Sequence, residues 1–213
     1  MAGDPMSTQR MKQTIRSRIL SNRDALPASL RTQFSTAITE RILQMPEYQA
    51  ARVVMGYMNF GTEFESEIWG RQALRDGKKL WLPKVNRSTN ELDVYCVNDL
   101  QNELVSGVWN IREPMPDRCL KVESLESLDF ILMPGVAFGR EGARLGYGGG
   151  FYDKLVARIT EECSGAHLPE RVAGAYSLQL IEDIPQEVTD RKVQWLVTEV
   201  ETIDCRRGGL RPD

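Results

Sequence analysis

The sequence predicts an α/β protein, a single-domain α/β/α sandwich around a mostly parallel sheet, with an N-terminal pair of helices. Short apolar runs typical of buried strands alternate with amphipathic helical stretches. A strand–helix–strand unit in residues 52–82 implies a parallel pair with a right-handed crossover. No repeat or long linker divides the 213 residues. We therefore expect one domain over residues 1–204 and a loose tail over residues 205–213.

Two helices are expected at the N-terminus. The first ends near Asp24 and has Ser7 or Thr8 as a candidate N-cap. Pro27 opens the second helix and Pro46 ends it. Apolar side chains at four-residue spacing support this second helix: Leu30, Phe34, Ile38 and Ile42.

One edge of the first helix carries a basic stripe of Lys12, Arg16 and Arg23. The apolar face beside this stripe consists of Met11, Ile15, Ile19 and Leu26. The ordinary interpretation of such a stripe is a solvated helix edge. The alternative is that the stripe overhangs a cleft and binds phosphate.

Strands and one helix follow in the middle and the second half of the chain. The expected strands are residues 52–58, 79–82, 91–97, 104–108, 130–133, 171–176 and 194–198. Ser66 caps the helix between the first two strands, and Pro83 closes the second strand. Residues 109–114 are expected to leave regular structure, because Pro114 and Pro116 keep them extended.

Composition excludes several classes of protein. A net charge of −3 and a pI near 5.4 argue against nucleic-acid binding. No apolar run approaches the roughly twenty residues of a membrane span, and residues 1–6 lack signal-peptide features. Four widely spaced cysteines predict reduced thiols, so we expect a cytoplasmic protein. The one histidine, His167, lies in a predicted loop, which argues against a zinc site or a histidine-based triad.

A glycine-rich segment follows the strand at residues 130–133. Seven of the sixteen residues 135–150 are glycine, and a helix is predicted from residue 151 to residue 159. A strand, a glycine loop and a helix together direct backbone N–H groups at an anion, usually phosphate. Arg140, Arg144 and Lys154 add positive charge. The alternative interpretation is a flexible surface loop.

This segment does not fit the two common phosphate-binding motifs. It contains no Gly-x-x-x-x-Gly-Lys-Ser/Thr sequence, and Phe151 stands where a Gly-x-Gly-x-x-Gly motif has its third glycine.

Carboxylates accompany the predicted phosphate cradle. Asp153 lies beside the cradle, and its carboxylate would repel a bound phosphate unless a cation lay between them, which points to Mg²⁺. The alternative is that Asp153 is only a favourable acidic residue in the first turn of the helix. Asp190 is a second candidate, with an Asx turn as its alternative role. Glu63 and Glu65 follow the first predicted strand, at the sheet edge where ligands collect.

Residues 133–138 and 144–153 closely resemble the 5-formyltetrahydrofolate cyclo-ligase family, also called methenyltetrahydrofolate synthetases. The motif Leu-Gly-x-Gly-x-Gly-aromatic-Tyr-Asp is highly specific, and weaker similarities follow the family order over nearly the whole chain. The resemblance implies an enzyme that uses ATP and Mg²⁺ to convert 5-formyltetrahydrofolate into 5,10-methenyltetrahydrofolate. ADP and phosphate would be released, through a phosphorylated imidate intermediate.

The resemblance also implies roles for particular residues. Lys12, Arg16 and Arg144 would bind the ATP phosphates as the catalytic cations, and Asp153 and Asp190 would hold Mg²⁺. The remaining ATP contacts would be Leu145, Gly146, Tyr147, Gly148, Gly149, Gly150, Phe151 and Tyr152. The folate contacts would be Met58, Glu63, Trp109, Tyr147, Gly148, Gly149, Gly150 and Phe151. Glu63 would hydrogen-bond the pterin, whereas core packing is the alternative role for Trp109.

The sequence departs from the family pattern at two places. Tyr147 and Gly149 stand where some members carry Arg and Lys, so positive charge must come from elsewhere in the loop or from the first helix. Thr189 stands where many members have His. Two other functions stay open: a folate- or nucleotide-binding protein without turnover, and an enzyme acting on another phosphorylated ligand. We expect small-molecule partners only, and a monomer or weak homodimer.

Overall fold

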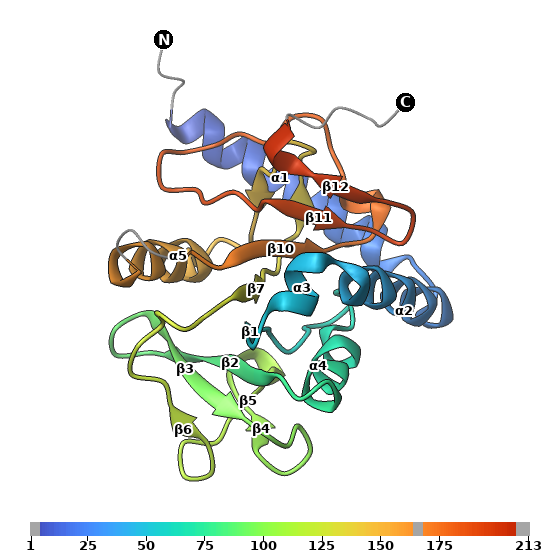
Figure 1. Cartoon of the computed structure of the whole chain (residues 1–213). Coiled ribbons are helices and arrows are strands. Elements are labelled where there is room, and N and C mark those ends of the chain that lie inside the picture. Colours follow the sequence, from blue (N-terminus) through green and yellow to red (C-terminus); the bar gives the residue numbers. More distant parts are fainter. Residues whose placement is uncertain (1–4, 164–167, 208–213) are drawn as a thin grey trace.

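An eight-stranded sheet forms the centre of the molecule (Figure 1). The computed structural model describes residues 5–163 and 168–207. In spatial order the strands are β12 (Thr202–Asp204), β11 (Trp195–Val197), β10 (Glu170–Gly174), β7 (Phe130–Leu132), β1 (Val53–Met55), β2 (Lys79–Asn86), β3 (Glu91–Val97) and β6 (Leu120–Lys121). The five strands from β11 to β2 are parallel, whereas β12 pairs antiparallel with β11, β3 with β2, and β6 with β3. The mostly parallel sheet is therefore confirmed.

Helices cover both faces of this sheet, which confirms the predicted sandwich (Figure 1). The helices on one face are α2 (Ala28–Gln44), α3 (Pro46–Ala50) and α4 (Ser66–Arg75), and the opposite face is covered by α5 (Phe151–Glu162). Alternate strand residues supply the two cores, because successive side chains of a strand point to opposite faces. Val54 thus packs with the first group of helices, whereas Met55 packs with α5.

A third core cluster fastens α1 (Pro5–Asp24) to the rest of the molecule. Ile19 of α1 packs there with Val136 and Leu145, which belong to the glycine-rich segment. That segment contains a short hairpin of β8 (Ala137–Phe138) and β9 (Arg144–Leu145), which we did not predict. The glycine-rich segment is therefore a buried hairpin up to Leu145 and a loop only from Gly146 onward.

Several predicted boundaries are wrong. Helix α1 already begins at Pro5, so Ser7 lies within the helix and its hydroxyl donates to Met11 Sδ at 4.0 Å. Met11 is half exposed rather than part of the buried face. Ser66 is the first residue of α4, and its hydroxyl donates to the Tyr57 carbonyl at 2.6 Å.

Pro83 lies inside β2 rather than at its end. Strand β1 pairs with β2 only as far as Trp81, so the missing N–H of Pro83 falls where that pairing has stopped. The segment that follows Trp109 was expected to leave regular structure, but part of it forms a strand. This strand, β5 (Arg112–Pro114), pairs with β4 (Leu104–Ser106).

The C-terminal segment is ordered further than predicted. Cys205–Arg207 forms the 3-10 helix η3, with Cys205 buried and its N–H donating to the Gln194 carbonyl at 2.9 Å. Residues 208–213 and His167 lie outside the described part of the chain. All four cysteines are free thiols. Within residues 5–163 and 168–207, no helix is both long and apolar enough to cross a bilayer.

Candidate active site

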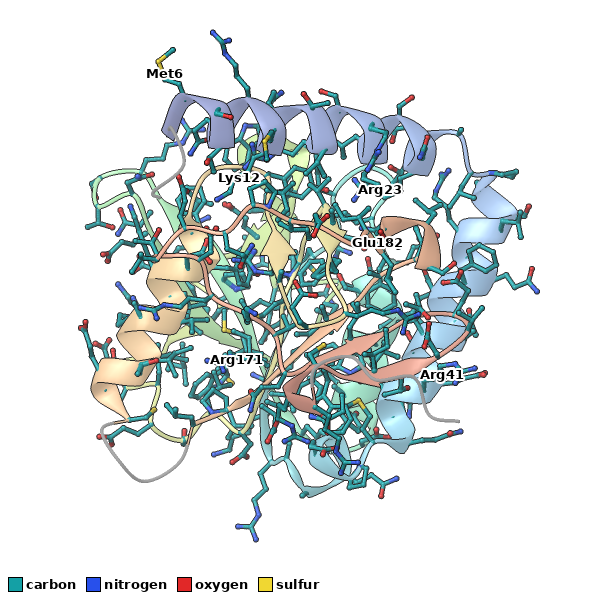
Figure 2. All side chains as sticks on the ribbon, turned by 90° about the horizontal axis from the view of Figure 1, so that it is seen from above. Met6, Lys12, Arg23, Arg41, Arg171 and Glu182 are labelled. Carbon is teal, nitrogen blue, oxygen red and sulfur yellow. The ribbon has the colours of Figure 1, made fainter. Side chains whose placement is uncertain are left out.

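The candidate site lies where the loops that follow parallel strands meet α1. Strands β1 and β7 are parallel neighbours, so residues 56–65 and 133–150 leave the sheet at the same edge. Lys12 and Arg23 lie on the side of α1 that faces the body of the molecule (Figure 2). They are only 4% and 2% exposed. The interpretation of the basic stripe as a solvated edge is therefore wrong.

The loop of residues 146–150 requires glycine at two positions. Gly148 has a φ of +108° and Gly150 a φ of +67°, values that glycine adopts without the steric cost other residues meet. Gly150 is the N-cap residue of α5, so the exposed loop leads directly to the N-terminus of that helix. The first N–H groups of a helix lack intrahelical partners. The strand–loop–helix arrangement expected for an anion cradle is present.

Two guanidinium groups flank this loop. Arg16 Nε donates to the Gly146 carbonyl at 2.8 Å. Arg144 is 6% exposed and pairs with Asp153 Oδ1 at 2.7 Å, and its Nη1 donates to the Pro134 carbonyl at 3.2 Å. Its buried Nε has no hydrogen-bond partner within the described parts of the chain. Arg144 therefore keeps donor capacity next to the cradle.

Two other cations expected near the loop point elsewhere. Arg140 lies before β9 and pairs with Glu201, with Nη–Oε distances of 3.1 and 2.5 Å. Lys154 donates to the Asn90 carbonyl at 3.0 Å, toward the turn between β2 and β3. The positive charge beside the loop therefore comes from Arg144 and α1.

The two candidate metal ligands lie in one neighbourhood. Asp153 Oδ1 accepts a hydrogen bond at 3.0 Å from the N–H of Arg191, the residue after Asp190. Asp190 Oδ2 accepts from Lys12 Nζ at 2.7 Å and also from the N–H of Glu187 at 2.8 Å, which closes a turn. Asp190 therefore lies at the site, and its turn contact runs back to Glu187 rather than forward as in an Asx turn.

These carboxylates fit a magnesium ion that is completed by its ligand. In the part of the chain that the structure describes, no group of three or more His, Cys, Asp or Glu side chains could hold a metal. Mg²⁺ does not need such a cage, because one or two carboxylates, phosphate oxygens and water satisfy it. Asp153 and Asp190 supply carboxylates of this kind beside the anion cradle.

Lys12 is held by two carboxylates. Its Nζ lies 2.9 Å from Glu187 Oε2 in addition to its contact with Asp190. Burial alone lowers the pKa of Lys12, but the hydrogen bonds and charges of the two acids outweigh burial and raise it. Lys12 therefore stays protonated at neutral pH. Glu187 had no sequence signal of its own, because it lies in an irregular segment.

Aromatic rings stand on the other side of the loop. Tyr147 and Phe60 are 42% and 40% exposed, and their ring centroids are 6.2 Å apart. Trp109 and Phe151 form a second pair at 6.5 Å. Trp109 is 61% exposed, so the alternative of core packing is wrong for it. Exposed ring pairs of this kind can receive a flat heterocycle.

A buried polar cluster lies behind the Phe60–Tyr147 pair. Glu63 is 5% exposed, and its Oε2 accepts the N–H of Phe60 at 2.7 Å. Burial raises the pKa of Glu63, whereas the Phe60 N–H, the charge of Arg23 and the Tyr147 hydroxyl lower it. Glu65 does not join this cluster, because it accepts the Thr32 hydroxyl of α2 at 2.8 Å.

Three expected contact residues are mainly structural. Leu145 packs in the core cluster beneath α1, and its carbonyl accepts the Val136 N–H at 2.7 Å. Met58 is 7% exposed and packs on the side of α2–α4. The ring of Tyr152 packs against both sheet cores, and its buried hydroxyl has no partner within the described residues. The sequence motif did not reveal where these three side chains point, since neighbouring residues of the chain point to different sides.

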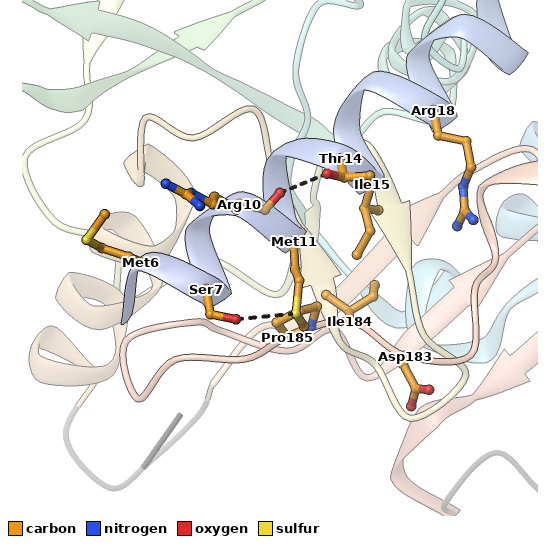
Figure 3. Close-up of a pocket in the computed structure, with 10 residues that line it drawn as sticks. All are labelled: Met6, Ser7, Arg10, Met11, Thr14, Ile15, Arg18, Asp183, Ile184 and Pro185. Atoms are coloured by element: carbon orange, nitrogen blue, oxygen red, sulfur yellow. Dashed lines mark hydrogen bonds between the residues drawn. The ribbon is translucent and has the colours of Figure 1, made fainter. Parts of the chain in front are cut away.

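A separate surface groove lies between α1 and residues 183–185 (Figure 3). Met11 and Ile15 line it from the helix, and Ile184 and Pro185 from the facing segment. None of the residues expected at the site lines this groove. The groove and the candidate active site are therefore distinct features of α1.

Comparisons with known proteins show which family the chain resembles. The model of the 5-formyltetrahydrofolate cyclo-ligase family matches residues 8–199. The mitochondrial 5-formyltetrahydrofolate cyclo-ligase of Arabidopsis thaliana is 31% identical over 206 residues, which cover 89% of this chain and 74% of the relative. The Escherichia coli enzyme of the same name is 29% identical over 180 residues, covering 84% and 96% of the two chains.

A solved structure extends the similarity to the whole fold. The 5,10-methenyltetrahydrofolate synthetase of Aquifex aeolicus superposes with a TM-score of 0.78 at 32% identity. The match covers 95% of this chain and 96% of that one. A family match over most of the length, joined to a shared fold, is decisive: this chain belongs to the 5-formyltetrahydrofolate cyclo-ligase family of enzymes.

Proposed function

We propose that this protein converts 5-formyltetrahydrofolate into 5,10-methenyltetrahydrofolate with consumption of ATP in the presence of Mg²⁺, releasing ADP and phosphate. Family membership supports the reaction. The structural observation that supports it most is the loop of residues 146–150. Arg16 and Arg144 contact one end of this loop, and Tyr147 within it joins the cluster of Glu63. One loop thus borders both a phosphate-binding and a heterocycle-binding environment.

The reaction needs a better leaving group than a formamide oxygen. Attack of that oxygen on the γ-phosphorus forms a new P–O bond and breaks the bond to the β-phosphate oxygen, releasing ADP. The neighbouring secondary amine of the folate then bonds to the formyl carbon and loses its proton. The C–O bond breaks with phosphate as the leaving group, which closes the five-membered ring. The protein contributes positioning and charge neutralisation, as in other phosphoryl transfers.

The residues divide these tasks between them. Lys12, Arg16 and Arg144 would bind the phosphates, and the N–H groups of residues 146–150 would complete the cradle. Asp153 and Asp190 would hold Mg²⁺, which when bound neutralises phosphate charge. Glu63 would accept hydrogen bonds from pterin N–H groups. The paired rings beside the loop would exclude water from the flat substrate.

An absorbance assay tests the proposal directly. Purified protein mixed with 5-formyltetrahydrofolate, ATP and Mg²⁺ should develop the methenyl absorbance at the border of the ultraviolet and visible ranges. Omitting ATP or adding a chelator should abolish the signal. Folate binding without any absorbance change would favour a binding protein instead. Neither binding nor turnover would favour an enzyme for another phosphorylated ligand.

Asp153→Asn should raise the Mg²⁺ concentration needed for half-maximal activity about tenfold or more, because a neutral amide is a weaker magnesium ligand. Activity measured across a Mg²⁺ titration at saturating ATP checks this. Asp183→Asn is the matched control, since Asp183 is exposed and lines the separate surface groove beside α1. An unchanged Mg²⁺ requirement in the Asp153 variant would contradict a metal role for this residue.

The cellular setting and the assembly state belong to the same proposal. Four free thiols support a reducing compartment, and we infer the cytoplasm. A monomer or weak homodimer is expected. Sedimentation over a range of protein concentrations would test the assembly state.

A further inference from the structure

Arg23 has contacts that the proposed phosphate chemistry does not explain. It is 2% exposed at the C-terminal end of α1. Its Nε donates to the Thr62 hydroxyl at 3.0 Å, and its Nη2 donates to the Tyr147 hydroxyl at 2.8 Å. It therefore joins three segments that are distant in sequence: α1, the loop after β1, and the glycine loop.

The guanidinium keeps unused binding capacity. Its Nη1 is buried and finds no hydrogen-bond partner among the residues that the structure describes. A buried donor without a partner is costly, and a charged one more so. A ligand acceptor would satisfy this Nη1, for which the described residues supply no partner.

The acidic group of this cluster is the carboxylate of Glu63. The Phe60 N–H, the charge of Arg23 and the Tyr147 hydroxyl all favour the charged form of this carboxylate. The remaining titratable groups that face it are Tyr57 from the loop after β1 and Tyr152 from α5. Both are neutral phenols with raised pKa, mainly through burial. Arg23 is therefore the positive charge that opposes the desolvation of Glu63.

The loop itself carries no basic side chain at residues 146–150. Tyr147 occupies one of the places where resembling sequences have a cation, and its hydroxyl is held by Arg23. The positive charge beside Tyr147 is thus supplied by Arg23 of α1 rather than by a side chain of the loop. A buried arginine is suited to this, since its charge persists at every working pH.

We infer that Arg23 is a positioning residue for folate binding. Its guanidinium holds Glu63 as a charged acceptor for the N–H groups of the pterin, fastens Tyr147 over it, and offers Nη1 to an acceptor atom of the same ring. This inference rests on the proposed function, because it assigns the pterin to the Glu63 cluster. Lys12, Arg16 and Arg144 remain the phosphate-binding cations.

The first experiment needs no folate. The side-chain carboxyl carbon of Glu63 is followed by NMR through a pH titration of the full-length protein, assigned with Glu63→Gln. In Arg23→Gln the pKa of Glu63 should rise by about one unit or more relative to the wild type, because an opposite charge has been removed. In Arg23→Lys the pKa of Glu63 should return most of the way to its wild-type value, because the positive charge is restored. Arg18→Gln, which removes an exposed charge from the same helix, is the matched control.

The second experiment measures the dissociation constant of 5-formyltetrahydrofolate against pH by calorimetry. The acid limb of binding should move to higher pH by about the same interval in Arg23→Gln, with ATP affinity unchanged within about twofold. An equal, pH-independent loss of folate and ATP affinity would show a merely structural role and overturn the inference. An unshifted Glu63 titration would overturn it too. If the wild type binds no folate while the Glu63 titration shifts as expected, only the proposed function fails, and the charge pairing stands.

Discussion

Arg144→Ala is expected to lower kcat by about a hundredfold or more, the usual cost of removing one preorganised donor from a developing charge. Arg144 is nearly buried, pairs with Asp153 and directs an unpartnered Nε into the site. Its nearest basic neighbours in the chain, Arg140 and Lys154, cannot take its place, because they are committed to contacts elsewhere. Steady-state turnover at saturating ATP, folate and Mg²⁺ checks the prediction.

The variant is expected to remain folded. Asp153 keeps the N–H of Arg191 as a hydrogen-bond donor and its side chain is 23% exposed, so its charge is not stranded in the interior. Arg140→Ala is the matched control from the same hairpin and should stay within about twofold of the wild-type kcat, because its ion pair with Glu201 is partly exposed. Equal losses in both variants, or wild-type turnover in Arg144→Ala, would refute the phosphate-binding role of Arg144.

Glu63→Gln is expected to weaken binding of 5-formyltetrahydrofolate by about a hundredfold. A buried acceptor that pairs with ligand N–H groups discriminates strongly, since the amide leaves donors facing donors. Affinity for ATP should change little, because Lys12, Arg16 and Arg144 are not among the groups that act on Glu63. Calorimetric titration with each ligand separates the two effects. Glu65→Gln serves as the control, since Glu65 is directed toward α2.

The same substitution should stabilise the ligand-free protein. Burial raises the pKa of Glu63 above its unfolded value, so its ionised form opposes folding. This loss of folding stability is complete at a pH above the pKa of Glu63 in the folded state. It disappears as the pH falls below the pKa of an unfolded glutamate, about 4.3. Glu63→Gln should therefore raise the melting temperature at neutral pH, and the gain should shrink on acidification. A gain that is constant with pH would show that the carboxylate charge is not its cause.

Some site residues could be predicted because their chemistry depends on local sequence. The left-handed backbone at Gly148 and Gly150 follows from glycine, and the loop's position before α5 follows from strand and helix punctuation. Asp153 has its place in the first turn of α5 by chain connectivity alone. The stripe on α1 was visible as well, since helical periodicity defines which side chains share a face.

Other site residues depended on contacts between distant segments. Glu187, and the contact of Arg23 with Tyr147, become visible only when α1 is laid across the loops by the packing of Ile19. Whether Trp109 is buried or exposed depends on the fold around it, because an aromatic side chain suits either environment.

The layered α/β architecture, the glycine loop and the family could be predicted from the chain's residues, because periodicity, turn residues and a dense local motif are properties of short stretches. Which cations serve the loop depends on the folded arrangement. Arg140, Lys154 and Arg23 are equally charged in the sequence. Their roles differ because a side chain takes the nearest acceptor that the folded chain offers. That acceptor is Glu201 for Arg140, a distant turn for Lys154, and the Tyr147 hydroxyl for Arg23.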